Sequence, residues 1–105
     1  MQEKDKKYLQ ELLEHSEKGS SRTTLKKLAK DMISLKEFNT ILQHKFDNDR
    51  FNSSEVISEI VSRWTSFKGS EANFNNFEKI SRAHGLNAEA GEWIDHFLNF
   101  RNLHV

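Results

Sequence analysis

Apolar residues recur at helical spacing along most of this 105-residue chain, and that pattern limits the fold more than any other feature. The clearest stretch, residues 54–67, has apolar side chains at positions i, i+1, i+4, i+5, i+8 and i+11. They are Val56, Ile57, Ile60, Val61, Trp64 and Phe67. On a helix these residues share one face, which we expect to run through the middle of a core. No stretch of four or more residues alternates cleanly, so the sequence predicts no strand.

The chain has no proline, so glycine and N-capping residues must set the helix ends. We expect Gly19 to end an N-terminal helix over 3–18 in the left-handed conformation. Ser34, followed three residues later by Glu37, forms a capping box and predicts a helix reaching residue 46.

Gly69 is expected to end the helix that starts at Ser53 or Ser54. Asn75 or Asn76 should open a short helix that Gly85 stops, and Asn87 should cap the last helix. The fold class that follows is all-α: a compact single domain over residues 1–105, built as a bundle of five or six short helices that includes helix-turn-helix-like pairs.

Composition agrees with one small domain and removes several chemistries. Only 35% of the residues are apolar, but eight phenylalanines and two tryptophans supply large buried areas. The absence of cysteine excludes disulfides, thiolate catalysis and cysteine-based zinc sites. Lysine plus arginine equals aspartate plus glutamate at 16 each, which argues against a strongly basic nucleic-acid coat. No apolar run approaches membrane length and the N-terminus is charged, so we expect a soluble, cytoplasmic protein without a membrane partner.

Residues 77–98 resemble a helix-turn-helix in their spacing. Ser81 is the small residue of the first helix, Gly85 the turn glycine, and Leu86 the apolar residue after the turn. The second helix, however, begins with Glu89 and Glu92 and has no early lysine or arginine, so it lacks the charge that meets phosphates. We therefore expect a packed helix pair here rather than a DNA reader.

Residues 24–46 can be aligned with 76–98 and carry the opposite charge. Residues 20–36 hold five basic side chains and one acidic side chain. The candidate DNA-binding residues are Arg22, Lys26, Lys27, Lys30, Ser34, Lys36, Asn39 and Gln43. The alternative is that the lysines are the solvated face of an ordinary helix.

Aromatic side chains form a stripe on the last helix, at Trp93, Phe97 and Phe100. Together with the neighbouring Ile94 and Leu98 they cover more than the usual buried arc. Either this helix is central in the core, or part of its face binds a protein partner, because large aromatics anchor interfaces. A homodimer would use this helix first and the N-terminal helix second.

Signatures of catalysis are missing. The five histidines have no recognised ligand spacing, and the glycines are too isolated to form a phosphate-binding loop. We expect no enzyme, metal or cofactor. The leading hypothesis is a small regulatory protein that binds another protein and modulates its activity or assembly, for example as an inhibitor. The alternative is a helix-turn-helix-type DNA-binding transcription regulator that uses residues 22–45.

Overall fold

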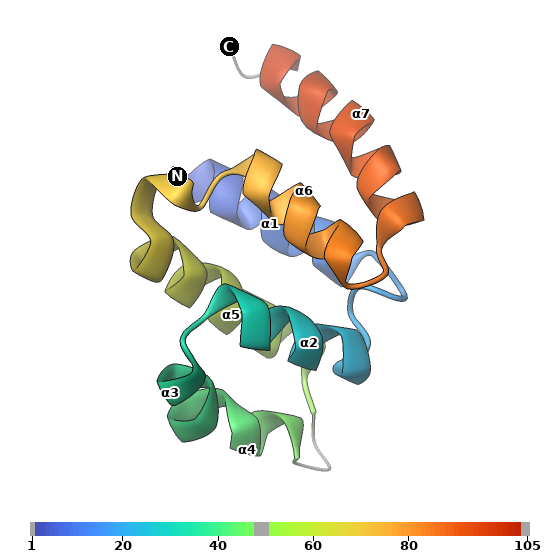
Figure 1. Cartoon of the computed structure of the whole chain (residues 1–105). Helices are drawn as coiled ribbons and strands as arrows, with labels where there is room; N and C mark the ends of the chain where they lie inside the picture. The colour runs from blue at the N-terminus through green and yellow to red at the C-terminus, as the bar shows by residue number, and fades with distance from the viewer. Residues whose placement is uncertain (1, 48–50, 104–105) are drawn as a thin grey trace.

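Helices are the only regular secondary structure in the part of the chain that the structure, a computed structural model, describes. That part is residues 2–47 and 51–103, without the side chains of Ile41 and residues 101–103. The helices are α1 (Glu3–Glu14), α2 (Arg22–Met32), α3 (Leu35–Glu37), the π-helical turn η1 (Phe38–Leu42), α4 (Gln43–Phe46), α5 (Ser53–Lys68), the 3-10 turn η2 (Gly69–Glu71), α6 (Phe74–Ala83) and α7 (Asn87–Leu103) (Figure 1). The all-α prediction is confirmed. No described helix combines the length and apolarity needed to cross a bilayer.

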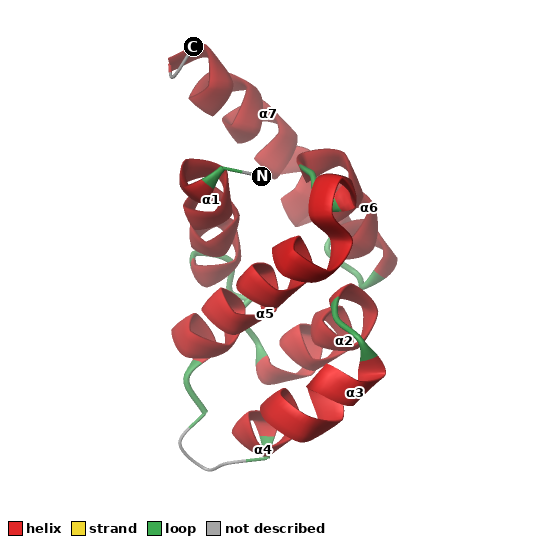
Figure 2. Ribbon diagram, turned by 90° about the vertical axis from the view of Figure 1, so that its left-hand side faces the viewer, coloured by secondary structure: helices red, strands yellow, loops and turns green. Residues whose placement is uncertain are grey.

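Helix α5 forms the centre of the core, as its apolar stripe predicts. Both α1 and α2 pack against it, and Figure 2 shows α5 crossing the middle of the molecule between them. Five residues of the stripe are buried: Val56, Ile57, Ile60, Val61 and Trp64. Phe67, the sixth, is 53% exposed and lies in the last turn of α5.

The segment after α2 begins at Ser34 as predicted, but only the Ser34 half of the predicted capping box forms, because the buried Glu37 Oε2 has no hydrogen-bond partner among the described residues. The Ser34 hydroxyl oxygen accepts a hydrogen bond from the Glu37 N–H at 3.2 Å, which starts α3. From there α3, η1 and α4 run on as one helical segment, with Phe38, Leu42 and Phe46 buried at i, i+4 and i+8. The described helices thus form six segments.

A glycine turn joins α6 to α7. Gly85 has φ 89°, and its N–H donates to the Arg82 carbonyl at 3.2 Å. The Leu86 N–H donates to the Ser81 carbonyl at 3.0 Å, and Leu86 is fully buried. These two bonds satisfy the last carbonyls of α6 as a Schellman motif does, and they direct the chain straight into α7.

Three predicted helix ends are wrong. Asn87 is the first residue of α7 rather than its cap, because the Ala90 N–H donates to the Leu86 carbonyl at 2.8 Å. Helix α1 ends at Glu14, and Gly19 has no positive φ. The Ser16 hydroxyl accepts from the Gly19 N–H at 2.9 Å, so a local side-chain bond replaces the backbone bond that this N–H would make if the helix continued. Helix α6 starts at Phe74, because the Asn73 side chain, rather than Asn75 or Asn76, caps it.

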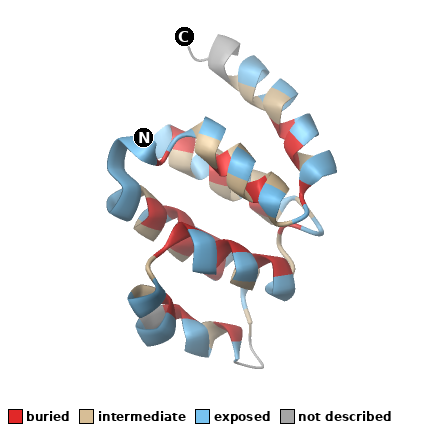
Figure 3. Cartoon of the chain, viewed as in Figure 1, coloured by how far each residue is buried: buried red, intermediate tan, exposed pale blue. Residues whose placement is uncertain are grey.

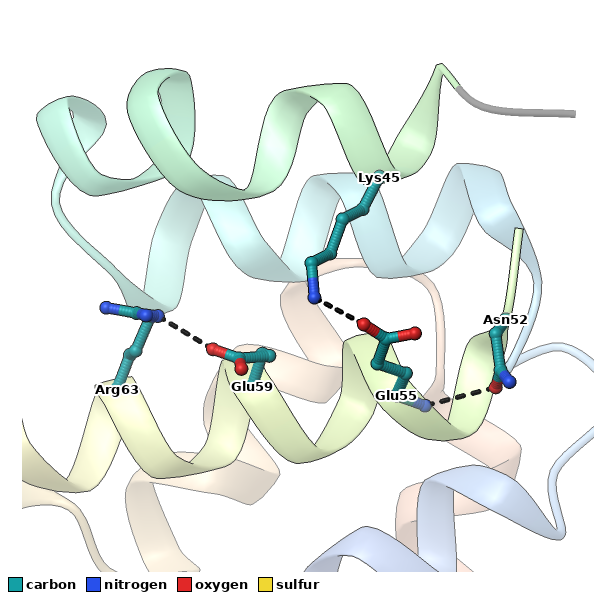
Figure 4. A network of polar contacts seen from close by, with 5 residues as sticks. All are labelled: Lys45, Asn52, Glu55, Glu59 and Arg63. Atoms are coloured by element: carbon teal, nitrogen blue, oxygen red, sulfur yellow. Dashed lines mark hydrogen bonds and ion pairs between the residues drawn. The ribbon is translucent and has the colours of Figure 1, made fainter. Parts of the chain in front are cut away.

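Polar contacts fix the start of α5 against α4 (Figure 4). The Asn52 side chain accepts from the Glu55 N–H at 3.1 Å, and the Lys45 ammonium lies 2.5 Å from the Glu55 carboxylate. One turn further on, Arg63 pairs with Glu59 at 2.9 Å. The Asn52 cap thus starts α5, and the Lys45–Glu55 pair joins its first turn to α4.

Helix α7 is buried only in its first half (Figure 3). Ala90 and Trp93 are its buried residues, whereas none of residues 94–100 is buried. Figure 1 shows this second half extending away from the other helices.

Candidate functional site

A groove of about 1010 Å³ lies between α1 and α7 in the described structure, and we call it the α1–α7 groove. Its lining residues are Tyr8, Glu11, Leu12, His15, Ser16, Glu17, Lys18, Ala88, Glu89, Glu92, Trp93, His96, Asn99 and Phe100. The contributions of both helices follow helical periodicity. Positions 8, 11, 12 and 15 lie on one face of α1, and positions 88, 89, 92, 93, 96, 99 and 100 lie on one face of α7.

Two contacts between the walls mark the ends of the groove. At one end the rings of Tyr8 and Phe100 stack with their centroids 4.4 Å apart. At the other end the Lys18 ammonium donates to the Gly85 carbonyl at 2.7 Å. Because the middle of α1 meets the last turns of α7, and the segment after α1 meets the turn just before α7, the two walls run antiparallel.

Apolar side chains and carboxylates share the groove. Leu12 and Trp93 contribute apolar surface between the two end contacts. Only 5% of the Trp93 surface is exposed, because its ring also packs on that of Phe77, with 5.7 Å between the ring centroids. Four glutamates line the groove, two from the α1 side and two from α7, against the single lysine. The surface is therefore apolar inside and acidic along both walls.

The Tyr8 hydroxyl oxygen is buried and has no hydrogen-bond partner among the described residues. Burial raises the pKa of this phenol above 10.0, because the charged phenolate would lose water contacts. Tyr8 is therefore a neutral, apolar-facing wall residue rather than an acid-base group at neutral pH.

A second, smaller hollow of about 300 Å³ lies next to α7, between α1 and the turn before α6. Phe74 and Phe97 both line it, and their rings stack at 3.9 Å. With a hollow on each side, the second half of α7 contacts α1 and α6 through the rings of Phe97 and Phe100, which pack on Tyr8 and Phe74.

The three aromatic residues predicted to bind a partner differ in placement. Trp93 is in the core and only its edge reaches the α1–α7 groove. Phe97 is half-buried and is not a lining residue; its ring stacks on Phe74 and also contacts the ring of Tyr8, with 6.0 Å between the Tyr8 and Phe97 centroids. Phe100 is half-buried and lines the groove. The structure thus brings Trp93 and Phe100 together at one surface and leaves Phe97 beside it.

The sequence indicated the N-terminal helix only as the second candidate for a dimer interface, and it did not place that helix opposite α7. Glu11 and His15 stand four residues apart next to the apolar stripe of α1, which indicates a shared face but not its neighbour. Only the fold brings that face opposite α7.

The predicted DNA-binding residues lie on the other side of the fold, on α2 and on the segment from α3 to α4. Six are exposed and two, Lys26 and Ser34, are half-buried; the exposed ones are Arg22, Lys27, Lys30, Lys36, Asn39 and Gln43. The Lys30 ammonium lies 5.5 Å from the centre of the Phe38 ring, a cation–π contact that joins α2 to the next helical segment.

The α6–α7 pair has the residue spacing of a helix-turn-helix, but its second helix does not begin with basic residues. Its buried Ser81 and Leu86 and its left-handed Gly85 match the spacing, while Glu89 and Glu92 line the α1–α7 groove. The acidic face of α7 therefore looks onto α1.

Among the described residues, no three histidine, aspartate or glutamate side chains are grouped closely enough to hold a metal ion. Comparisons with protein-family models, with curated proteins and with solved structures find no match to this chain.

Proposed function

We propose that the chain is a small non-catalytic regulatory protein that binds another protein in the α1–α7 groove and modulates that partner's activity or assembly. The observation that carries this proposal is the groove itself. It is large, open and lined by Tyr8, Leu12, Trp93 and Phe100, the aromatic and aliphatic side chains that anchor protein interfaces. Residues 94–100 of α7, which belong to one of its walls, include no buried residue, and this part of the wall can adjust to an incoming surface.

A variant that fills the groove tests this function. Ala88 is exposed and lines the groove, so Ala88→Trp blocks the site without entering the core. Ala83 is also exposed, lies at the end of α6 and is absent from the lining, so Ala83→Trp is the matched control. Affinity capture from the native host with the three proteins as baits, followed by quantitative mass spectrometry, measures the difference.

We expect at least one protein to be retained by the parent chain and by Ala83→Trp, and to be lost about tenfold or more from Ala88→Trp, the size of change expected at a packed interface. If the two tryptophan variants capture the same proteins equally, the groove is not the binding surface and the proposal fails.

DNA binding is the second candidate, and the observation that favours it is the exposed basic face of α2 and α3. Arg22, Lys27, Lys30 and Lys36 are all exposed and could each meet a phosphate. Anisotropy of a labelled duplex at about 0.05 M and about 0.2 M salt tests it, because phosphate contacts make the affinity fall steeply with salt. Lys27→Glu with Lys30→Glu should abolish such binding.

Lys4→Glu with Lys7→Glu is the matched control for the DNA test. It has the same spacing and charge change, at exposed positions on α1. An absence of binding at the lower salt concentration, or equal losses in both double variants, would exclude a DNA reader on α2 and α3.

A further inference from the structure

The walls of the α1–α7 groove carry one sign of charge although the whole chain is neutral. Glu11 and Glu17 stand on the α1 side, and Glu89 and Glu92 on α7. The only lysine among the lining residues, Lys18, donates to a backbone carbonyl at the end of the groove. A bound segment would therefore meet carboxylates on both sides of an apolar strip. Complementary charge of this kind selects partners and steers their approach.

The dimensions of the groove suit a short helix. The lining residues of α7 run from position 88 to position 100, which at 1.5 Å per residue is about 18 Å, or roughly three helical turns. The apolar strip between Leu12 and Trp93 is continuous with the stacked rings of Tyr8 and Phe100. An amphipathic helix would place an apolar stripe at i, i+4 and i+7 on this strip.

We propose that the partner segment is an amphipathic helix of another protein that bears lysine or arginine on both sides of its apolar stripe. This inference rests on the proposed function and adds the chemistry of the partner to it. The apolar stripe supplies the buried contact, and the flanking cations pair with Glu11 and Glu17 on one wall and with Glu89 and Glu92 on the other.

Three synthetic helical peptides of about 16 residues test the inference directly. They share one leucine and phenylalanine stripe and differ only in the flanking residues, which are lysine, glutamine or glutamate. Fluorescence titration of the full chain measures each dissociation constant at about 0.05 M and about 0.5 M salt. We expect the lysine peptide to bind about tenfold or more tighter than the glutamine peptide, and the glutamate peptide to bind weakest. The differences should shrink at the higher salt concentration.

Charge reversal on one wall provides the matched variants. Glu89→Lys with Glu92→Lys should remove the preference for the lysine peptide. Asp47→Lys with Glu71→Lys makes the same change in net charge at exposed positions outside the groove lining and should leave the preference in place. If the reversed protein does not fold, Glu89→Gln with Glu92→Gln replaces it, and the preference should then fall by about threefold or more.

The outcomes separate this inference from the proposed function. Equal binding of all three peptides would overturn the charge selection and leave the groove as a protein-binding site. If no peptide binds, the helical occupant is wrong, while the capture experiment with Ala88→Trp still decides the function. Self-association of the parent chain that Ala88→Trp abolishes and Ala83→Trp preserves would assign the groove to a second copy and would also overturn the inference.

Discussion

Two glycines near the start of α7 differ in backbone conformation, since Gly85 has a positive φ and Gly91 is helical. Gly85 has φ 89°, a region that residues with a Cβ rarely adopt, and a Cβ there would make only an ordinary van der Waals contact with Lys18 Nζ, at 3.5 Å. Gly91 lies inside α7 with ordinary helical geometry, and a Cβ there would meet no described atom within 4 Å. Backbone strain rather than space therefore separates the two positions.

Gly85→Ala should lower the free energy of unfolding by about 1–2 kcal/mol, because alanine is strained at positive φ. Gly91→Ala should raise it by about 0.5–1 kcal/mol, because alanine loses less conformational entropy in a helix. Urea denaturation of the two variants measures the opposite signs. Effects of the same sign would contradict the left-handed turn between α6 and α7.

The Ser81 hydroxyl should lower the stability of the fold at the α6–α7 pair. Ser81 is fully buried, and its hydroxyl oxygen has no hydrogen-bond partner among the described residues. Ser81→Ala should therefore raise the free energy of unfolding by about 1 kcal/mol more than Ser58→Ala, which makes the same change at an exposed site in α5. Equal effects in thermal denaturation would mean that the Ser81 hydroxyl is satisfied.

At the scale of whole helices, the sequence predicts faces better than neighbours. The stripe of α5, the cap at Ser34 and the turn at Gly85 depend on residues close together in the chain, and all three were predicted correctly. The end of α1 was missed because the Ser16 hydroxyl competes for the Gly19 N–H, which helical periodicity does not reveal.

The candidate site was only half predictable for the same reason. The wide apolar arc of α7 indicated a surface with more than one neighbour, and Trp93 and Phe100 do line the α1–α7 groove. The opposite wall comes from α1, about 80 residues earlier in the chain. Helical periodicity shows which face of a helix is apolar, but not which distant helix lies opposite that face.

The Lys45–Glu55 pair holds the end of α4 against the first turn of α5. The Lys45 ammonium donates a hydrogen bond to the Glu55 carboxylate, and this bond and the lysine charge lower the glutamate pKa below 4.5. Because the pKa of the folded state is depressed, the pair stabilises the fold above pH 4.5. That contribution is lost as the pH falls through the lowered value.

Replacing Lys45 should restore an ordinary pKa at Glu55. In Lys45→Met the Glu55 carboxylate should titrate near 4.5, and the stability difference from the parent chain should shrink as the pH falls below that value. Lys36→Met, at an exposed lysine in α3, is the control and should leave the Glu55 titration unchanged. Carboxyl-detected NMR titration measures both. A normal Glu55 pKa in the parent chain would show that the pair does not persist in solution.

Across the whole molecule, packing decreases from α5 towards the end of α7. Buried residues run along α5 from Val56 to Trp64, whereas residues 94–100 of α7 contain none. Stability should follow the same gradient, because segments with little buried apolar area open without unfolding the rest. The wall of the α1–α7 groove that would adjust to a partner is thus the part of the bundle that opens most readily.

Hydrogen exchange tests this gradient and the role of the Tyr8–Phe100 stack. In the parent chain, amides of α7 beyond residue 94 should exchange faster than those of α5, which should report global unfolding. Phe100→Ala removes a ring stacked 4.4 Å from Tyr8 and should speed exchange in the second half of α7 by about three- to tenfold, leaving α5 nearly unchanged. Leu98→Ala is the control on the same helix, since Leu98 is 55% exposed and should have little effect. Equal acceleration in α5 and α7 would mean that α7 opens only when the whole bundle unfolds, and the groove would then have two fixed walls.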